Sequence, residues 1–365
     1  MKILIFYRNL RQGGVQRMMV NFANHMIETG SEVTLLLISR EGEFLSLVKP
    51  NVKIKTLEAN GKNYLKALVA ELKYGRYDSM FTATPTLNTL SILSQKLSGT
   101  RTRVIISERS DTTREFLDGG IKTYKLSFLL IPLLYRFAHA IVAVSKGVAS
   151  GLGKFAWLDE KKIHVIYNPA FDSSQQYQLH EPVDEPWLEK KETQVVISAG
   201  RLTEQKNFPL LFNAVKLIKE RGISLRLIII GDGPLRVSLQ NLIDDLGLTE
   251  NVKMVGFKIN PIAWISKSDV FVMSSAWEGF GNILVDALAS GTTIVSTACK
   301  SGPAEILADG KYGYLTSVSD PNEMADKILY ALAHPMPQSE LLERAKSFER
   351  STIMRKYESL FAEIN

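Results

Sequence analysis

Two cations and one carboxylate are the first candidates for a functional site in this sequence. Each follows a strand-like apolar run, and loops at strand ends are where parallel sheets bind ligands. Arg201 and Lys206 come after residues 194–200, and Glu278 comes after residues 269–275. Arginine presents a planar fork of donors and lysine a compact cation, so these two side chains of one loop could bind a single diphosphate. If the loop has no ligand, both cations are simply solvated.

A tight turn follows another strand-like run, residues 225–231. Open parallel sheets bind ligands at the carboxyl ends of their strands, which makes this turn a candidate for contact with a ligand. Glycine, aspartate and proline also favour turns for conformational reasons alone, so a purely structural role stays open. The turn consists of Gly231, Asp232, Gly233 and Pro234.

A glycine-rich segment after Glu278 leads into an expected helix that ends at Gly291. Free N–H groups at a helix N-terminus, together with the helix dipole, form a site for an anion such as phosphate. Asn282 and Asp286 are one helical turn apart and share a face, against which a ribose could lie. Glu278 would face the group attached to the phosphate, or it would cap the helix. The ligand-contacting residues expected after it are Gly279, Phe280, Gly281, Asn282 and Asp286.

The sequence lacks the motifs of several other chemistries. It contains no G-x-x-x-x-G-K-[ST] phosphate loop, no G-x-G-x-x-G after the first strand and no G-x-S-x-G elbow. The histidines lack the spacing of a metal site, and no Asp-x-Asp pair is present. We therefore expect neither a metal nor a cofactor.

The apolar runs alternate with helical stretches in two series. A strand at 2–7, a helical stripe from Val15 to Gly30 and a strand at 32–38 form a βαβ unit. Such alternation indicates parallel sheets covered on both faces, and hence an α/β fold with two Rossmann-like domains facing each other across a cleft. Further strands are expected at 103–107, 140–144 and 164–168, and in the second series at 194–200, 225–231, 269–275 and 292–297.

Residues 171–192 form the best candidate linker, because they are polar and acidic and contain Pro182 and Pro186. This boundary gives an N-terminal domain of residues 1–170 and a C-terminal domain of residues 193–349. We expect the C-terminal helix, residues 350–365, to join the N-terminal domain.

The net charge of +6 is unevenly distributed. Residues 1–170 contain 24 Lys/Arg and 13 Asp/Glu, whereas residues 171–365 contain 20 and 25. A basic half suggests nucleic acid, anionic lipid or a phosphorylated substrate as partner, although a solvated basic face gives the same composition. Cations interrupt apolar side chains in residues 64–76 and 121–137, as on a membrane-binding surface, but the apolar part of the second segment would equally form core.

A single cysteine, Cys299, excludes an intramolecular disulfide and favours a reducing compartment. The longest apolar run, residues 126–135, is ten residues long, whereas a spanning helix needs about 20. The apolar start of the chain is too short for a signal peptide. We therefore expect a cytoplasmic protein without a transmembrane segment.

Together these segments resemble the retaining GT-B glycosyltransferases of glycosyltransferase family 4, particularly members that assemble bacterial polysaccharides. The resemblance covers nearly the whole chain, and its specificity lies in the order and spacing of motifs that are modest singly. The matching segments are 13–15, 143–145, 165–169, 200–202 with Lys206, 231–234 and 278–281.

The resemblance implies a role for each matched residue. Arg201 and Lys206 would neutralise the diphosphate of a nucleotide-sugar donor, Glu278 would hydrogen-bond the transferred sugar, and Asp286 would hold the ribose. Backbone N–H groups near Gly14 and Gly281 would assist the two cations without a metal ion. The loop of Gly13 and Gly14 would face the donor, and Val255, Gly256 and Phe257 would lie beside the base.

Two departures from the family pattern bear on specificity. The second glutamate of the family's pair is Asp286 here, which shortens the reach of the carboxylate by one methylene. Ser107-Glu108-Arg109 stands where many relatives have a histidine that contacts the sugar, so Glu108 and Arg109 are expected to replace it. This segment points to a hexose or N-acetylhexosamine donor and a lipid-diphosphate-linked acceptor.

The resemblance thus implies a metal-independent, retaining glycosyltransferase that uses a UDP-sugar. The acceptor would be a saccharide on a polyprenyl diphosphate lipid, and the basic N-terminal domain would hold the protein peripherally on the inner face of the cytoplasmic membrane. A sugar-nucleotide epimerase of the same fold, or a non-catalytic binder of carbohydrate or nucleic acid, remains an alternative. Because no nucleic-acid-binding motif is present, we expect no nucleic acid partner.

Overall fold

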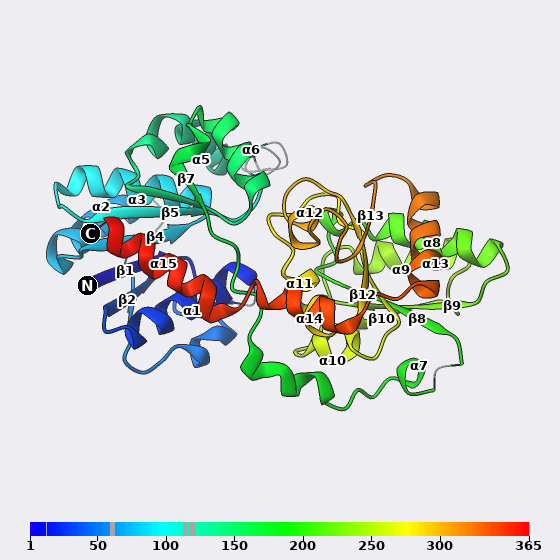
Figure 1. Cartoon of the computed structure of the whole chain (residues 1–365). Helices are drawn as coiled ribbons and strands as arrows, with labels where there is room; N and C mark the ends of the chain where they lie inside the picture. The colour runs from blue at the N-terminus through cyan, green and yellow to red at the C-terminus, as the bar shows by residue number, and fades with distance from the viewer. Residues whose placement is uncertain (12, 59–62, 112–115, 117–121, 191, 365) are drawn as a thin grey trace. The chain divides into compact units, whose positions relative to one another are not determined.

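The computed structural model describes residues 1–11, 13–58, 63–111, 116, 122–190 and 192–364, and the side chains of all of these except 122–126 and 174–176. The chain forms two compact units (Figure 1). Unit 1 comprises Met1–Pro169 and Ser351–Asn365, and unit 2 comprises Ala170–Arg350. The last helix therefore belongs to the same unit as the N-terminal half of the chain.

Unit 1 is built on a seven-stranded parallel sheet with the strand order β3-β2-β1-β4-β5-β6-β7. The order changes direction between β1 and β4, which is the switch point of a doubly wound sheet. Most of its strands are buried on both faces, which explains their nearly continuous apolar sequences. The strands are β1 (Lys2–Tyr7), β2 (Glu32–Leu37), β3 (Lys53–Thr56), β4 (Ser79–Ala83), β5 (Arg103–Glu108), β6 (Ala140–Ala143) and β7 (Ile163–Val165).

Helices cover both faces of this sheet. On one face the C-terminal helix α15 packs with α1, because the rings of Tyr357 and Phe361 lie 5.5 and 5.1 Å from that of Phe22. On the other face α3 packs on β4 and β5 and against α2 and α5. The helices are α1 (Gly14–Glu28), α2 (Tyr64–Gly75), α3 (Pro85–Ser98), α5 (Lys122–Leu134), α6 (Lys146–Ala156) and α15 (Arg350–Ile364), with 3-10 turns η1 (Glu43–Leu47), η3 (Tyr135–Phe137) and η4 (Glu160–Lys162).

Unit 2 repeats this plan with a six-stranded parallel sheet in the order β10-β9-β8-β11-β12-β13. Its switch point lies between β8 and β11, which pair through Val196 with Val270 and Ile197 with Phe271. The strands are β8 (Gln194–Ala199), β9 (Leu225–Ile230), β10 (Val252–Gly256), β11 (Val270–Met273), β12 (Thr293–Thr297) and β13 (Tyr314–Thr316).

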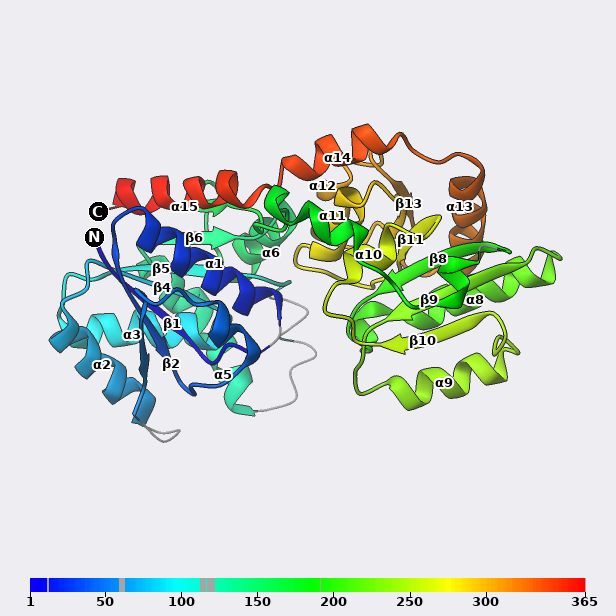
Figure 2. The same cartoon turned by 90° about the horizontal axis from the view of Figure 1, so that it is seen from below.

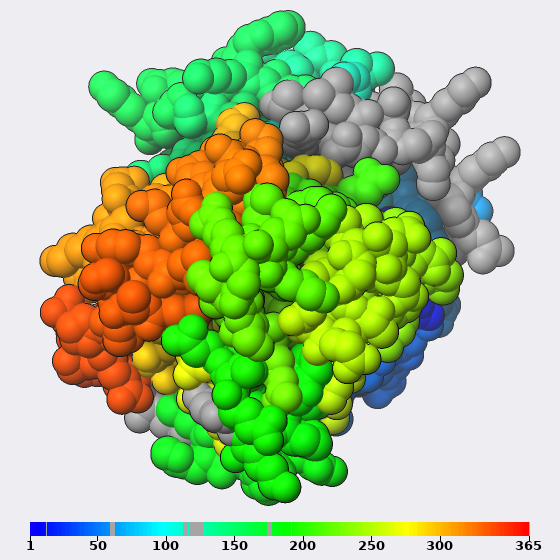
Figure 3. Space-filling view, turned by 90° about the vertical axis from the view of Figure 1, so that its right-hand side faces the viewer, coloured from blue at the N-terminus to red at the C-terminus, as the bar shows by residue number. Residues whose placement is uncertain are grey.

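The core of unit 2 lies between its sheet and the helices α8, α9 and α13. Figure 2 shows these helices beside the strands, and Figure 3 shows their residues next to one another on one face of the surface. Helices α10, α11 and α14 pack against one another away from that core. The helices are α7 (Pro186–Glu189), α8 (Phe208–Glu220), α9 (Arg236–Asp245), α10 (Pro261–Ile265), α11 (Asn282–Ala289), α12 (Pro303–Ile306), α13 (Pro321–Ala333) and α14 (Gln338–Lys346), with 3-10 turns η5 (Ser173–His180) and η6 (Glu204–Lys206).

Every strand predicted from the sequence is present, and the α/β fold with two Rossmann-like halves is confirmed. Four strands escaped the prediction. Strand β3 alternates polar and apolar residues at a sheet edge, and β13 has only three residues, so neither gives a continuous apolar run. Strands β4 and β10 are likewise short and interrupted by Ser, Thr, Lys or Gly.

The expected linker, residues 171–192, is instead largely attached to unit 2. Asn260 Nδ2 donates to the carbonyl oxygen of Gln178 at 2.8 Å, and Lys253 Nζ lies 2.7 Å from Glu185 Oε1. Its polar composition is therefore that of a surface segment rather than a free connection. Within the described residues, no helix combines the length and apolarity that crossing a bilayer requires.

Two glycines permit the close approach of the loops that follow β8 and β9. A Cβ at Gly231 would lie 1.9 Å from the carbonyl oxygen of Gly200, and a Cβ at Gly233 would lie 2.6 Å from that of Leu202. Gly231 also has a φ of +141°, which side chains rarely adopt. The turn 231–234 is therefore pressed against the loop that contains Arg201.

We predict that Gly231→Ala lowers the free energy of unfolding of unit 2 by about 3 kcal/mol, because it combines a backbone clash with an unfavourable φ. Gly247→Ala is the matched control, since Gly247 also has a positive φ (+67°) but nothing within 4 Å of an added Cβ. That change should cost only about 1 kcal/mol. Three of the four tryptophans lie in unit 2, so urea unfolding followed by fluorescence measures both; equal costs would contradict the close approach.

Candidate functional site

The candidate site forms where the switch point of unit 2 places two loops side by side. The loop after β8 contains Arg201 and Lys206, and the loop after β11 contains Glu278. Because β8 and β11 are neighbouring parallel strands, both loops emerge at the same carboxyl edge of the sheet. The sequence could place each loop at a strand end, but only the strand order makes them neighbours.

Three hydrogen bonds tie these two loops together. Ala276 N donates to the carbonyl oxygen of Gln205 at 2.8 Å, and Gln205 Nε2 donates to the carbonyl oxygen of Trp277 at 3.0 Å. Ser274 Oγ donates to the carbonyl oxygen of Lys206 at 2.8 Å. The relative positions of the cation and the carboxylate are thus fixed by the backbone as well as by their own contact.

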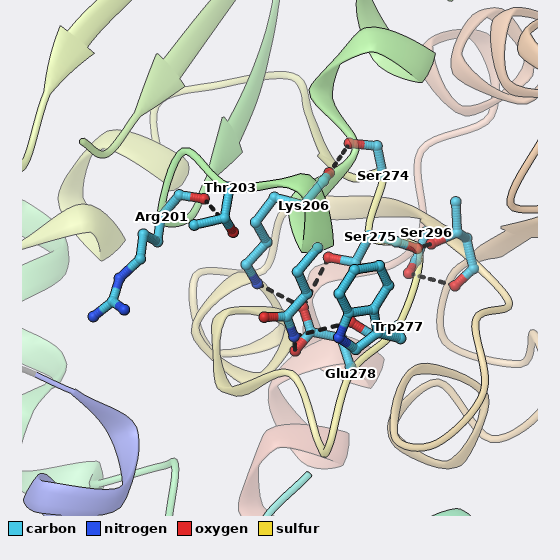
Figure 4. A network of polar contacts seen from close by, with 10 residues as sticks. Arg201, Thr203, Lys206, Ser274, Ser275, Trp277, Glu278 and Ser296 are labelled. Carbon is cyan, nitrogen blue, oxygen red and sulfur yellow. Dashed lines mark hydrogen bonds and ion pairs between the residues drawn. The ribbon is translucent and has the colours of Figure 1, made fainter. Parts of the chain in front are cut away.

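Lys206 and Glu278 form a nearly buried ion pair at the centre of this edge (Figure 4). Lys206 Nζ lies 2.6 Å from Glu278 Oε1, which also accepts a hydrogen bond from Ser275 Oγ at 2.8 Å. Gln205 Nε2 is 3.4 Å from Glu278 Oε2. The side chains of Lys206 and Glu278 are 16% and 9% exposed, so the pair is little screened by solvent.

Local backbone features hold Lys206 in this position. Gly200 leaves room for its aliphatic stem, since a Cβ there would lie 2.8 Å from Lys206 Cε. Asn207 has a φ of 45°, and this left-handed residue ends the turn η6 and starts α8. Asparagine tolerates that conformation better than most residues.

Arg201 does not lie beside Lys206 as expected for two cations that bind one diphosphate together. Its side chain is exposed, and Figure 4 shows its guanidinium directed away from the ion pair of Lys206 and Glu278. Within the described residues, the guanidinium makes no hydrogen bond or ion pair. It is therefore available to an anion from solvent, whereas Lys206 already has a carboxylate partner.

The segment 279–281 turns the chain into α11 as predicted from its glycines. Gly281 is the N-cap residue of the helix, has a φ of 102° and provides no side-chain cap. Phe280 is expected to contact a ligand, but its side chain is 2% exposed and its ring packs 5.5 Å from that of Phe348. Asn282 and Asp286 both lie in α11 one turn apart and are half-buried.

The glycine turn after β9 and the end of β10 adjoin the Arg201 loop. Leu202 N donates to the carbonyl oxygen of Asp232 at 3.0 Å, and Gly231 N donates to that of Gly256 at 2.9 Å. Phe257, next in the chain, is 55% exposed although it is a large apolar ring. Gly233 and Val255 are half-buried, and Pro234 is exposed.

In unit 1, Gly13 and Gly14, which the sequence predicts to face the donor, lie at the start of α1. Gly13 is the N-cap residue of α1 and provides no side-chain cap, and Gly14 begins the helix. The loop follows β1 at the switch point of the first sheet. Thr84, which the sequence analysis missed, follows the neighbouring strand β4 with a φ of 81°. A β-branched residue in that conformation is strained, and such strain concentrates at functional sites.

Glu108 departs from its expected role as a sugar contact. It is the last residue of β5, its side chain is 0% exposed, and its Oε1 accepts hydrogen bonds from Asn88 Nδ2 at 2.8 Å and from the hydroxyl of Tyr135. Direct contact with a substrate is therefore excluded in this structure. Arg109 turns to the other face, where it donates to the hydroxyl of Tyr357 at 3.1 Å.

Cys299 lies beside the ion pair, at the end of β12. Burial raises the pKa of its thiol to about 12, helped by the charge of Glu278 and opposed by a hydrogen bond with Thr297 and by Lys206. The thiol is 3% exposed. It is therefore a neutral packing group under the carboxylate rather than a nucleophile.

The sequence analysis missed Gln205 and Ser275, which hold Glu278 by direct contact. Both lie in the strand-end segments that it singled out, but polar residues in loops carry no sign of which neighbour they bind. Within the part of the chain that the structure describes, no cluster of three or more His, Cys, Asp or Glu side chains could hold a metal ion.

Comparison with known proteins defines the class to which this fold and site belong. The model described as "Glycosyltransferase Family 4" matches residues 12–170, and "Glycosyl transferases group 1" matches residues 181–350. An "Uncharacterized glycosyltransferase" of Methanocaldococcus jannaschii is 30% identical over 71% of each chain. The chain therefore belongs to the GT-B glycosyltransferases of family 4, and it is a glycosyltransferase enzyme.

Particular relatives are similar over the whole length. An N-acetylgalactosamine-N,N'-diacetylbacillosaminyl-diphospho-undecaprenol 4-alpha-N-acetylgalactosaminyltransferase of Campylobacter jejuni is 28% identical over 97% of each chain. The solved structure of Anabaena HepE with UDP and glucose superposes with a TM-score of 0.80 at 20% identity and covers both chains fully. The lipopolysaccharide outer core galactosyltransferase WaaB gives 0.78 at 18% identity over the same coverage, so these two structures share the GT-B fold.

We predict that Cys299 reacts with a thiol reagent such as DTNB at pH 8 about a thousandfold more slowly than an exposed cysteine, because little thiolate exists at that pH. Unfolding in guanidinium should release one reactive thiol, since the chain has a single cysteine. Its raised pKa favours the folded state below about pH 9, and that contribution is lost as the pH rises further. Rapid stoichiometric labelling of the native protein would contradict the buried position beside Glu278.

Proposed function

We propose that this enzyme transfers a hexose or N-acetylhexosamine from a UDP-sugar, with retention of anomeric configuration, to a saccharide on a lipid diphosphate. The observation that carries the proposal is the pairing of Lys206 with Glu278 at the switch point of unit 2. The names of the relatives support the setting, since the Campylobacter protein uses a diphospho-undecaprenol acceptor and WaaB acts in lipopolysaccharide. The reaction would thus serve the assembly of bacterial surface polysaccharides.

The chemistry is governed by the charge on the leaving group. As the bond between sugar and phosphate breaks, negative charge grows on the diphosphate, and preorganised donors aimed at it lower the barrier. Arg201 offers an unpaired guanidinium, α11 offers the positive end of its dipole, and Lys206 offers an ammonium close to both loops. In this proposal, these groups serve in place of a metal ion.

Lys206 would change partners when the donor binds. In the structure its ammonium is held by Glu278, and an incoming diphosphate competes for the same cation. Glu278 would then keep its hydrogen bond from Ser275 and turn its free capacity to a sugar hydroxyl. The ion pair therefore prepares both groups, because each is desolvated and oriented before the substrate arrives.

The remaining residues of the edge fit the rest of a nucleotide. In this proposal Asp286, one turn along α11 from Asn282, accepts a hydrogen bond from a ribose hydroxyl, and the exposed ring of Phe257 stacks on the base. We further propose that a donor phosphate oxygen accepts the proton of the attacking hydroxyl on the same face, because no carboxylate of this site is free to act as a nucleophile while Glu278 binds the sugar.

We expect two substitutions to separate binding of the diphosphate from transfer of the sugar. Arg201→Ala should weaken UDP binding and lower kcat/KM by roughly 100- to 1,000-fold, the usual effect of removing one such donor. Glu278→Gln should bind UDP as well as or better than the wild type, because it releases Lys206, while transfer falls by about 100-fold. Calorimetry with UDP and release of UDP from UDP-sugars measure the two effects.

Lys216→Ala is the control for these variants, because Lys216 is an exposed cation of α8 outside the site. GDP and ADP should bind more weakly than UDP. Loss of UDP affinity in Glu278→Gln, or unchanged transfer in Arg201→Ala, would argue against the assigned roles, and turnover of the UDP-sugar without any acceptor would favour an epimerase.

We also propose that unit 1 binds anionic membrane through α5. This helix is apolar on two faces: Phe128 and Ile131 are fully buried, whereas Leu129 and Leu133 are 60% and 58% exposed. Phe137, four residues further, is 47% exposed, and Lys96 Nζ lies 4.9 Å from its ring centroid. Exposed leucines beside cations suit a lipid surface. Lys122 and Lys125, which the sequence analysis included, have side chains outside the described residues.

We predict that Leu129→Ser/Leu133→Ser weakens binding to phosphatidylglycerol vesicles by at least about 100-fold, because each leucine contributes on the order of 1.5–3 kcal/mol when buried in lipid. Binding should also weaken with salt. Val237→Ser is the matched control, since Val237 is 73% exposed on α9 of unit 2. Co-flotation measures binding, and equal loss in both variants, or no binding by the wild type, would exclude α5 as the membrane contact.

A further inference from the structure

A basic cavity lies at the amino edge of the sheet in unit 1, the edge opposite to the carboxyl ends of its strands. It has a volume of about 640 Å³ and is lined by residues that precede β1, β4 and β5, together with the end of α15. Strands of six residues separate this amino edge from the carboxyl edge by roughly 17 Å. A ligand in this cavity would therefore not overlap the residues at the carboxyl edge. The lining residues are Met1, Arg76, Tyr77, Asp78, Thr100, Arg101, Thr102, Arg103 and Ala362.

Three arginines face this cavity without a carboxylate partner. In the described part of the chain, the guanidiniums of Arg76, Arg101 and Arg103 make no hydrogen bond or ion pair. The one acidic residue of the lining is Asp78, and its Oδ2 already accepts a hydrogen bond from Lys2 N at 2.7 Å. The cavity therefore gathers positive charge that the protein itself does not neutralise.

Two features beside the cavity agree with an uncompensated positive charge in its lining. The pKa of His139, which precedes β6 at the same edge, is lowered by burial and by the charges of Arg103 and Lys96. Arg76 adopts a φ of 49°, a left-handed conformation that is costly for arginine. This turn ends α2 and brings Arg76 to the rim of the cavity.

We propose that this cavity binds a phosphate group that bears a small organic substituent. Arginine matches the oxygens of phosphate with its planar fork, and three such groups converge on one concave site. The volume exceeds that of an inorganic ion and lies within the range of small-molecule sites. The phosphate can come from a soluble ester or from a lipid headgroup, and both sources present the same chemistry to the three guanidiniums.

The test uses the full chain and offers it a phosphate group in two forms, a soluble ester and a lipid headgroup. Glycerol 3-phosphate is titrated by calorimetry at fixed ionic strength, and vesicles with and without phosphatidylglycerol are used in co-flotation. We expect wild-type protein to bind at least one of them, and Arg76→Gln/Arg101→Gln to bind it about tenfold more weakly or worse. Binding of the soluble ester alone identifies a metabolite. Weaker vesicle binding by Arg76→Gln/Arg101→Gln without any binding of the soluble ester identifies a lipid headgroup, because the α5 surface is unchanged in that variant.

Arg40→Gln is the matched control, because it removes an exposed arginine of unit 1 that does not line the cavity. It should change either affinity by less than about twofold. UDP binding should be the same in all three proteins, which separates this proposal from that for the carboxyl edge of unit 2. Absence of binding to both probes, or equal weakening in the control, would overturn the proposal.

Discussion

The site depends on one contact, the nearly buried pair of Lys206 and Glu278. Two charges at this depth are stable only together, because removing either one leaves the other desolvated and uncompensated at a cost of about 3–5 kcal/mol. The same coupling keeps the cation and the carboxylate within 2.6 Å of each other and at one edge of the sheet. In the proposed function this structural ion pair also forms part of the substrate site, and the diphosphate of the donor replaces Glu278 as the partner of Lys206.

The scaffold around this pair is organised by close backbone approach rather than by large side chains. Gly231 and Gly233 let the turn after β9 press on the loop after β8, and Gly302 lets another loop meet the carbonyl oxygen of Phe280. Each contact would be lost with a single added Cβ. The glycines thus act by bringing the loops of the site together.

Unit 1 uses its polar residues in a different way. Glu108 is held inside by Asn88 and Tyr135, so this carboxylate orders the end of β5. Alternation along the strand then sends Arg109 to the opposite face, where Tyr357 of the last helix accepts its hydrogen bond. The return of α15 to the first unit therefore supports a residue at the carboxyl edge of β5. Arg76, Arg101 and Arg103 lie at the other edge of the same sheet.

The sequence alone determined most of the strands, the α/β class and the loops that contain the candidate site, because period, apolar runs and turn residues are local properties. It placed Arg201, Lys206 and Glu278 at strand ends for the same reason. It missed β3, β4, β10 and β13, whose short or interrupted sequences give no continuous apolar run. It could not determine that Lys206 faces Glu278, that Glu108 lies in the core or that Gln205 and Ser275 hold the carboxylate. Those facts follow from the strand order, which makes β8 and β11 neighbours, and from the face toward which each side chain turns. Contacts between residues more than 70 positions apart are decided only when the sheet assembles.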